Sequence, residues 1–116
     1  MGLFGNKSGK SFDDYVREAQ ASAEAIILDV RSEDEFAREH IKGAINVPVN
    51  RIASIRDVID NLDVPVYVHC LSGARSSRAV KAMQKMGYTK TVNMGGINSY
   101  NGPVESGSIG SSGGAR

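Results

Sequence analysis

The chain has little cysteine, proline or aromatic content: one cysteine, three prolines and no tryptophan among 116 residues. A single thiol excludes an internal disulfide framework and leaves Cys70 without a resolving partner in its own chain. No apolar stretch approaches the roughly 20 residues that span a bilayer. A formal net charge of +1 gives no long-range attraction to nucleic acid or to an acidic surface. We therefore expect a cytoplasmic protein that binds neither nucleic acid nor membranes.

The composition indicates one domain with polar segments at both ends. A hydrophobic fraction of 41% is enough for a single core in a chain of this length. Residues 1–10 contain no apolar core of signal-peptide length and are predicted to form a flexible N-terminus. Residues 101–116 are rich in glycine and serine and predict a flexible tail. The domain itself is expected at 11–100.

Hydrophobic periodicity within 11–100 alternates between strand and helix patterns. Short apolar runs with β-branched residues predict buried strands, and apolar positions three or four residues apart predict helices. The predicted strands are 25–30, 44–48, 64–69 and 91–94; the predicted helices are 12–22, 33–39, 51–60 and 76–86, with a turn at 40–43. This alternation is typical of an α/β domain with a mainly parallel central sheet and helices on both faces.

Cys70 lies at the point where the third strong strand pattern ends and a short loop leads into a helix pattern. Ligands of parallel sheets bind outside the carboxyl ends of the strands. Backbone N–H groups and the helix dipole at such a position favour negative charge, and they lower the pKa of a thiol. The alternative is a small buried hydrophobic residue without chemistry. The strand–loop–helix setting favours a reactive thiolate.

Asp29 and Arg31 follow the first strong strand and are secondary candidates on the same rim. The simpler interpretation is structural, with these side chains ordering the rim through backbone hydrogen bonds or ion pairs. His69 alternates with Tyr67 and is interpreted as a strand residue rather than a catalytic base. His40 is interpreted as a turn residue that makes local hydrogen bonds.

Several segments between about residues 12 and 100 form a recognisable series: Leu28-Asp29-Val30-Arg31, Glu35-Phe36, His40-Ile41-Lys42-Gly43-Ala44-Ile45-Asn46-Val47-Pro48, Cys70-Leu71-Ser72-Gly73-Ala74-Arg75-Ser76, Gly87-Tyr88, Val92 and Gly95-Gly96. The order and spacing of these segments resemble the rhodanese-like sulfurtransferase family. Two departures are visible: Tyr100 holds the place where the family commonly has tryptophan, and His69 precedes the cysteine where an apolar residue is frequent. Neither departure removes a group that the reaction needs.

This resemblance implies a rhodanese-like three-layer fold and sulfur transfer through a persulfide on Cys70, without another cofactor. A thiolate can accept a sulfane sulfur, and a ring of amide N–H groups stabilises the charged outer sulfur of the product. Arg75 can hold an anionic donor at the loop mouth or pair with a carboxylate behind it. The implied cradle comprises Leu71, Ser72, Gly73, Ala74, Arg75 and Ser76.

The expected partners follow from this chemistry. The donor is a small anion such as thiosulfate, and the acceptor is cyanide, a small thiol or a partner protein's thiol, because the chain has no second cysteine. We expect a monomer or weak dimer. No group of histidines and cysteines has metal-ligand spacing, so we expect no metal.

Two alternatives remain beside a turnover enzyme. The first is a persulfide carrier or regulatory binding module with little turnover of its own. The second is a cysteine phosphatase or arsenate reductase, because His69-Cys70 and Arg75-Ser76 resemble the loop of those enzymes. Four residues separate Cys70 from Arg75, whereas that loop has five, so the cradle here suits a sulfur atom better than a tetrahedral oxyanion.

Overall fold

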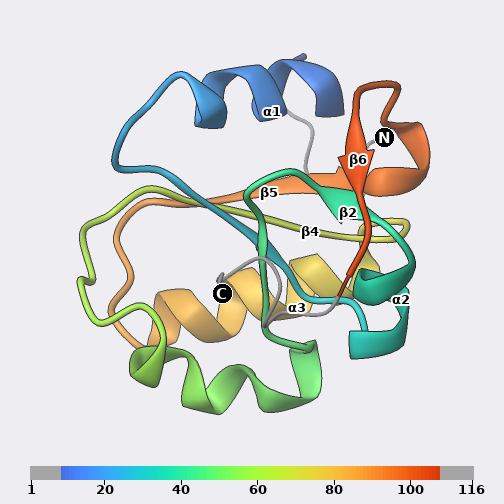
Figure 1. The fold of residues 1–116 in the computed structure, drawn as a ribbon. Coiled ribbons are helices and arrows are strands. Elements are labelled where there is room, and N and C mark those ends of the chain that lie inside the picture. The colour runs from blue at the N-terminus through green and yellow to red at the C-terminus, as the bar shows by residue number, and fades with distance from the viewer. Residues whose placement is uncertain (1–8, 108–116) are drawn as a thin grey trace.

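The computed structural model describes residues 9–107 as three layers (Figure 1). The predicted flexible N-terminus, except for residues 9 and 10, and residues 108–116 of the predicted tail lie outside the described residues. In chain order the elements are α1 (Phe12–Gln20), β1 (Ile26–Asp29), α2 (Glu33–Arg38), β2 (His40–Ile41), β3 (Ile45–Asn46), the 3-10 helix η1 (Val49–Asp57), β4 (Val66–Cys70), α3 (Ala74–Lys85), β5 (Thr91–Gly96), the 3-10 helix η2 (Ile97–Ser99) and β6 (Val104–Glu105).

A four-stranded sheet in the order β3-β1-β4-β5 forms the middle layer. Each neighbouring pair of strands is parallel, as the alternating pattern predicted. The register places Asp29 opposite His69, and Cys70 opposite Gly96. The carboxyl ends of the three longer strands therefore meet at one edge of the sheet.

The two faces of the sheet have separate hydrophobic cores (Figure 1). Helix α1 covers one face, where Tyr67 belongs to the same core as the buried α1 residues. Helices α3 and η1 cover the other face, whose core includes Val68 and Cys70. Because side chains alternate along a strand, β4 directs Tyr67 and His69 toward α1 and directs Val68 and Cys70 toward α3.

Serine caps mark the starts of the first two helices. Ser11 and Ser32 both form capping boxes at the starts of α1 and α2, and Glu35 supplies the carboxylate of the second box. Gly87, with φ +103°, follows the last turn of α3 in the left-handed conformation that favours glycine. Predicted and observed helices differ most at 51–60, where the structure has the 3-10 helix η1 with a kink at Arg51.

The predicted turn at 40–43 is wrong for its first two residues, because His40 and Ile41 form strand β2. This strand pairs antiparallel with β6, so His40 lies opposite Glu105. The chain therefore remains folded through residue 107, past the boundary at residue 100 that composition suggested. Both strands are two residues long, and neither is long enough for a periodic pattern to reveal it.

His40 makes the local hydrogen bonds expected of it. Its Nδ1–H donates to the carbonyl of Phe36 at 2.7 Å, and its ring stacks on the Phe36 ring at a centroid distance of 3.7 Å. Within residues 9–107, no helix has the length and apolar character needed to cross a membrane.

Candidate active site

Cys70 is the last residue of β4, and its side chain is fully enclosed. The loop that follows curls back over the sulfur, so the Gly73 N–H donates to Sγ at 3.0 Å. The Ser76 hydroxyl oxygen lies 3.5 Å from the same sulfur. Cys70 is thus buried, as a small hydrophobic residue without a catalytic role would be. Unlike such a residue, it has polar groups close to its sulfur.

Burial alone would raise the pKa of the Cys70 thiol. The Ser76 hydroxyl and the backbone N–H groups of Ser76, Gly73 and Ser72 lower it by hydrogen bonding, and these contributions outweigh burial. The net result is a pKa below the ordinary cysteine value. Helix α3 begins at Ala74, so the sulfur also faces the positive end of a 12-residue helix. The site therefore favours the thiolate, the nucleophilic form of cysteine.

Two glycines give the loop its shape. Gly73 has φ +112° and ψ −16°, a left-handed conformation that residues with a Cβ rarely adopt, and it turns its own N–H toward the sulfur. Gly96 lies across from the loop at the end of β5. A Cβ there would lie 2.2 Å from the Leu71 carbonyl oxygen and 2.6 Å from the Ser72 Cα. The absence of a side chain at Gly96 is therefore what lets the loop pack against the sheet.

Ser76 connects the sulfur to strand β5. Its hydroxyl oxygen lies 3.0 Å from the Gly73 carbonyl oxygen and 2.8 Å from Asn93 Oδ1, and its single proton is shared among these acceptors and the sulfur. Asn93 also accepts from the Gly95 N–H at 3.0 Å. A register irregularity between β4 and β5 accompanies this arrangement. Sequence reasoning missed Asn93; its only signal was a polar residue between the apolar Val92 and Met94 of the strand.

Arg75 pairs with a carboxylate instead of remaining open toward the loop mouth. Its Nη1 and Nη2 donate to the two carboxylate oxygens of Glu35 at 2.8 and 3.1 Å. Of the two roles predicted for Arg75, the structure has the ion pair. In the sequence, Glu35 was identified only through the matching segment Glu35-Phe36, and the structure adds its capping role at the start of α2. Its second contact depends on α2 packing beside the start of α3, which no local pattern reveals.

Asp29 and Arg31 form a buried ion pair with each other. Arg31 Nη2 donates to Asp29 Oδ2 at 2.7 Å, and a second hydrogen bond runs from Arg31 Nη2 to the carbonyl of Glu39 at 2.8 Å. Asp29 also accepts from the Arg31 backbone N–H at 3.0 Å. The structural interpretation of these two residues therefore agrees with their contacts, and a direct role with substrate stays a prediction.

His69 is buried between Asp29 and α1. Its Nδ1–H donates to the Cys70 carbonyl at 3.1 Å, and its ring meets Phe12 edge to face. Nε2 lies 3.6 Å from Asp29 Oδ2, beyond hydrogen-bond distance. Burial lowers the pKa of His69 more than the Asp29 carboxylate raises it, which favours the neutral ring. Because its side chain points to the α1 face, His69 is not directed at the Cys70 sulfur.

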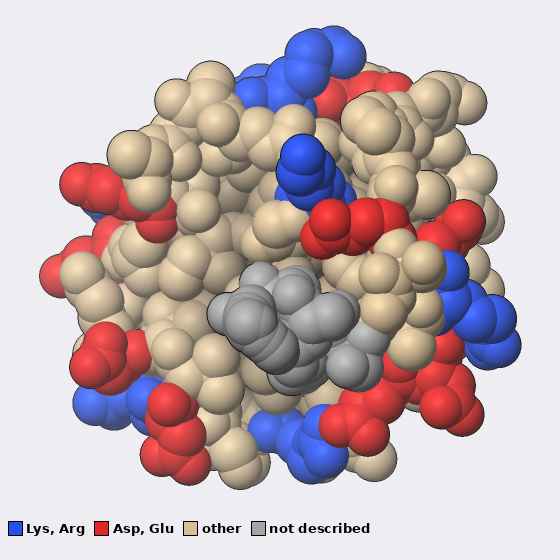
Figure 2. Space-filling model, viewed as in Figure 1, with Lys and Arg blue, Asp and Glu red and all other residues tan. Residues whose placement is uncertain are grey.

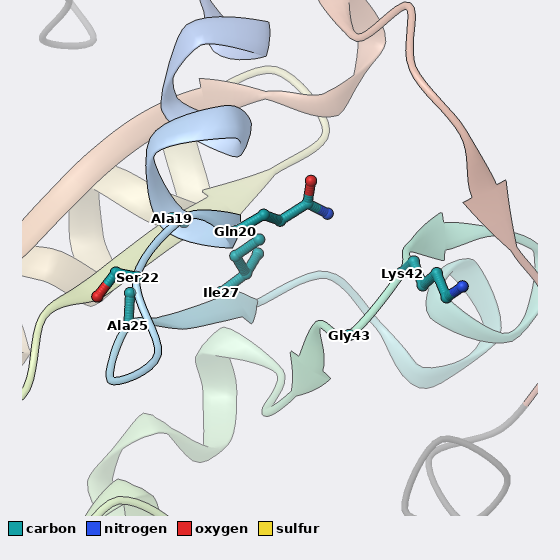
Figure 3. A pocket seen from close by; sticks show the side chains of 7 residues that line it. All are labelled: Ala19, Gln20, Ser22, Ala25, Ile27, Lys42 and Gly43. Carbon is teal, nitrogen blue, oxygen red and sulfur yellow. The ribbon is translucent and has the colours of Figure 1, made fainter.

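The rest of the described surface offers no competing centre of similar chemistry. A pocket of about 210 Å³ lies between α1, the start of β1 and the segment after β2 (Figure 3). Its lining includes Ile27 and Lys42 but not Cys70, which lies at the opposite end of the strands. Within residues 9–107, no group of three or more histidine, cysteine, aspartate or glutamate side chains is placed to hold a metal. Basic and acidic side chains are interspersed on the face shown in Figure 2.

The model of the rhodanese-like domain family matches residues 12–102, which is most of the chain. The chain belongs to the rhodanese-like domain family. The match covers β1, the Cys70 loop and β5, so it contains every site residue described above. Solved structures agree: a rhodanese from Escherichia coli superposes with a TM-score of 0.67 at 31% identity, covering 72% of this chain and 99% of that one. A rhodanese-like domain protein from Staphylococcus aureus gives 0.70 at 26% identity, with 84% and 96% coverage.

Two of the following three relatives of this rhodanese-like chain carry names from sulfur chemistry, and the third is uncharacterized. Thiosulfate sulfurtransferase PspE of E. coli is 34% identical over 71 residues, 60% of this chain and 68% of that protein. The putative sulfur carrier protein YrkF of Bacillus subtilis is 28% identical over 96 residues, 82% of this chain. An uncharacterized Bacillus subtilis protein, YqhL, is 35% identical over 82 residues, 70% of this chain. The matched segments span 51% of YrkF and 64% of YqhL.

Proposed function

We propose that this protein is a sulfurtransferase that carries a sulfane sulfur on Cys70 as a persulfide. The observation that carries the proposal is the Gly73 N–H directed at Cys70 Sγ at 3.0 Å, within a loop whose amides and helix dipole lower the pKa of the thiol. The same donors suit the charged outer sulfur of a persulfide. The sulfurtransferase and sulfur-carrier names of the relatives support the same chemistry.

The proposed reaction has two displacements. The Cys70 thiolate attacks the outer sulfur of thiosulfate, the sulfur–sulfur bond of the donor breaks, and its electron pair leaves with sulfite. The product is Cys70–S–S⁻. A nucleophile such as cyanide then attacks the outer sulfur, thiocyanate leaves, and the electron pair of the broken bond restores the Cys70 thiolate. Ping-pong kinetics follow from this order.

Access to the sulfur requires a movement, because Cys70 has no exposed surface. The loop above it carries Leu71, with 43% of its surface exposed, and the exposed Ser72. We propose that a displacement of these two residues opens the sulfur to a donor while the Gly73 N–H stays beside the reacting atom.

The decisive experiment is the intact mass of the protein after incubation with thiosulfate and removal of excess donor. We expect a gain of one sulfur atom that disappears on addition of cyanide and is absent in Cys70→Ala. The proposal would be overturned if the wild-type protein gained sulfur neither from thiosulfate nor from a small persulfide. Sulfur gained equally by Cys70→Ala would also overturn it, because the chain has no other thiol.

A carrier with little turnover is the second candidate, and the resemblance to a putative sulfur carrier favours keeping it. Steady-state formation of thiocyanate separates the two. An enzyme turns over many times with thiosulfate and cyanide, whereas a carrier exchanges sulfur with these small molecules too slowly for appreciable turnover. Both outcomes require the persulfide.

A further inference from the structure

The carboxylate of Glu35 is held in place from two sides. One of its oxygens accepts from the Ser32 backbone N–H at 2.9 Å in the capping box of α2, and both accept from Arg75. Both side chains of the pair are partly buried. The Arg75 guanidinium lowers the pKa of Glu35 to about 2, so Glu35 is ionised at every pH at which the protein is expected to work.

Arg75 is the only basic residue of the loop from Cys70 to Ser76, and its charge is already balanced. The hydrogen bond from Glu35 raises the pKa of Arg75, and the charges of Glu35, Cys70 and Asp29 raise it further. The charge of Asp29 is in turn matched by Arg31. On α2, the helix that carries Glu35, Glu33 and Asp34 are exposed, as is Glu39 just beyond its end, and Arg38 is the exposed basic residue among them.

We propose that Glu35 is a specificity-determining residue, which, by pairing with Arg75, directs the site toward sulfur donors that carry at most one negative charge. This inference rests on the proposed sulfur transfer and specifies its donor class. A dianion such as thiosulfate is opposed by Glu35 and by the thiolate, and it finds no uncompensated cation in the loop. A neutral or monoanionic donor, such as a protonated persulfide, meets a smaller barrier.

The favoured reaction needs only the Cys70 thiolate and the persulfide donor. The Cys70 thiolate attacks the outer sulfur of R–S–SH, the sulfur–sulfur bond breaks, and R–S⁻ leaves with the electron pair. Cys70–S–SH remains and passes its proton to solvent, which leaves the persulfide anion facing the Gly73 N–H. Methanethiosulfonate anion is a stable probe with one charge: its outer sulfur moves to Cys70, and methanesulfinate leaves.

The test compares loading of Cys70 by thiosulfate and by methanethiosulfonate in wild type and Glu35→Gln, measured as second-order rate constants by intact mass. Glutamine keeps the capping box, since its amide oxygen still accepts from the Ser32 N–H. Removal of the negative charge that pairs with Arg75 is expected to accelerate loading by the dianion about tenfold and by the monoanion about threefold. The acceleration factor expected for the dianion is the square of the factor for the monoanion, because the electrostatic free energy is proportional to the donor's charge.

Glu33→Gln is the matched control. It removes the same charge from the same helix, but Glu33 pairs with Arg51 away from the loop. We expect both donors to load this variant at nearly wild-type rates. Equal acceleration of the two donors in Glu35→Gln, or no acceleration of either, would overturn the role of Glu35 without touching the persulfide. Failure of both donors to load wild type would instead overturn the proposed function.

A second measurement uses only the wild-type protein. If Glu35 balances the positive charge of Arg75, the rate of thiosulfate loading rises or stays level as salt is added, because salt screens the remaining repulsion between thiosulfate and the site. A steep fall with added salt would show an uncompensated positive charge at the mouth and would contradict the proposal, even if Glu35→Gln failed to fold.

Discussion

The Ser76 hydroxyl is the residue-scale feature that most directly controls the reactive sulfur. It lies between the Cys70 sulfur, the Gly73 carbonyl and Asn93, all of which accept a proton or share one. When Cys70 is ionised, the hydroxyl can turn its single proton toward the sulfur. The Gly73 N–H cannot turn, because the loop backbone fixes it. The two donors therefore act differently: one is a permanent donor and the other responds to charge.

Ser76→Ala removes the responsive donor. Because the native contacts lower the pKa of Cys70, losing one of them raises it, and the thiolate fraction at neutral pH falls. We expect alkylation of Cys70 by iodoacetamide at neutral pH to slow by about tenfold, the size of one hydrogen bond to a charged group. The pH–rate profile should move toward higher pH. Ser77→Ala is the control, and an unshifted profile in Ser76→Ala would show that its hydroxyl does not act on the sulfur.

At the scale of elements, the site is a junction between the end of β4, the start of α3 and the end of β5. The short helix η2, directly after β5, supports the loop, because its Asn98 N–H donates to the Leu71 carbonyl at 3.2 Å. Gly96 brings that strand close enough for this contact. Helix α2 approaches from the other side through Glu35 and Arg75. The loop is thus held by three elements that are distant in sequence.

Gly96→Ala tests this support. A Cβ would meet backbone atoms of Leu71 and Ser72, which cannot move aside as a flexible side chain can. We expect a loss of about 1–3 kcal/mol in the free energy of unfolding, as for other overpacked sites, and slower sulfur loading of the folded protein. Denaturant unfolding and intact mass measure the two effects.

The control for Gly96→Ala is Gly43→Ala. Gly43 has φ +85° and nothing within 4 Å of a Cβ, so its substitution strains the backbone without touching the loop. It should cost about 1–2 kcal/mol and leave sulfur loading unchanged. If Gly96→Ala also leaves sulfur loading unchanged, the close packing of β5 is not what shapes the loop.

At the scale of the whole molecule, β6 returns the end of the described chain to α2 and β2. His40 Nε2 lies 3.3 Å from Glu105, and the Gly107 N–H donates to the Ala37 carbonyl at 2.8 Å. These contacts tie residues 101–107 to the part of the molecule that carries Glu35. The segment is therefore part of the folded domain, although its composition resembles a linker.

Truncation measures that contribution. A chain ending at residue 100 loses the β2–β6 pairing and the Gly107 hydrogen bond, and we expect its free energy of unfolding to fall by about 2 kcal/mol, the sum of a few net hydrogen bonds. A chain ending at residue 107 retains all of these contacts and is the control. Equal stability of the two chains in urea would show that residues 101–107 add nothing to the fold.

The sequence by itself determined the parallel α/β architecture and the position of Cys70 at a strand end. These features depend on local patterns: short apolar runs, and the loop and helix pattern that follows the third of them. Only the tertiary structure decided that Arg75 meets Glu35, that Ser76 meets Asn93, and that a two-residue strand closes on His40. Those contacts join segments far apart in the chain, where side-chain direction and packing, rather than any local periodicity, bring the groups together.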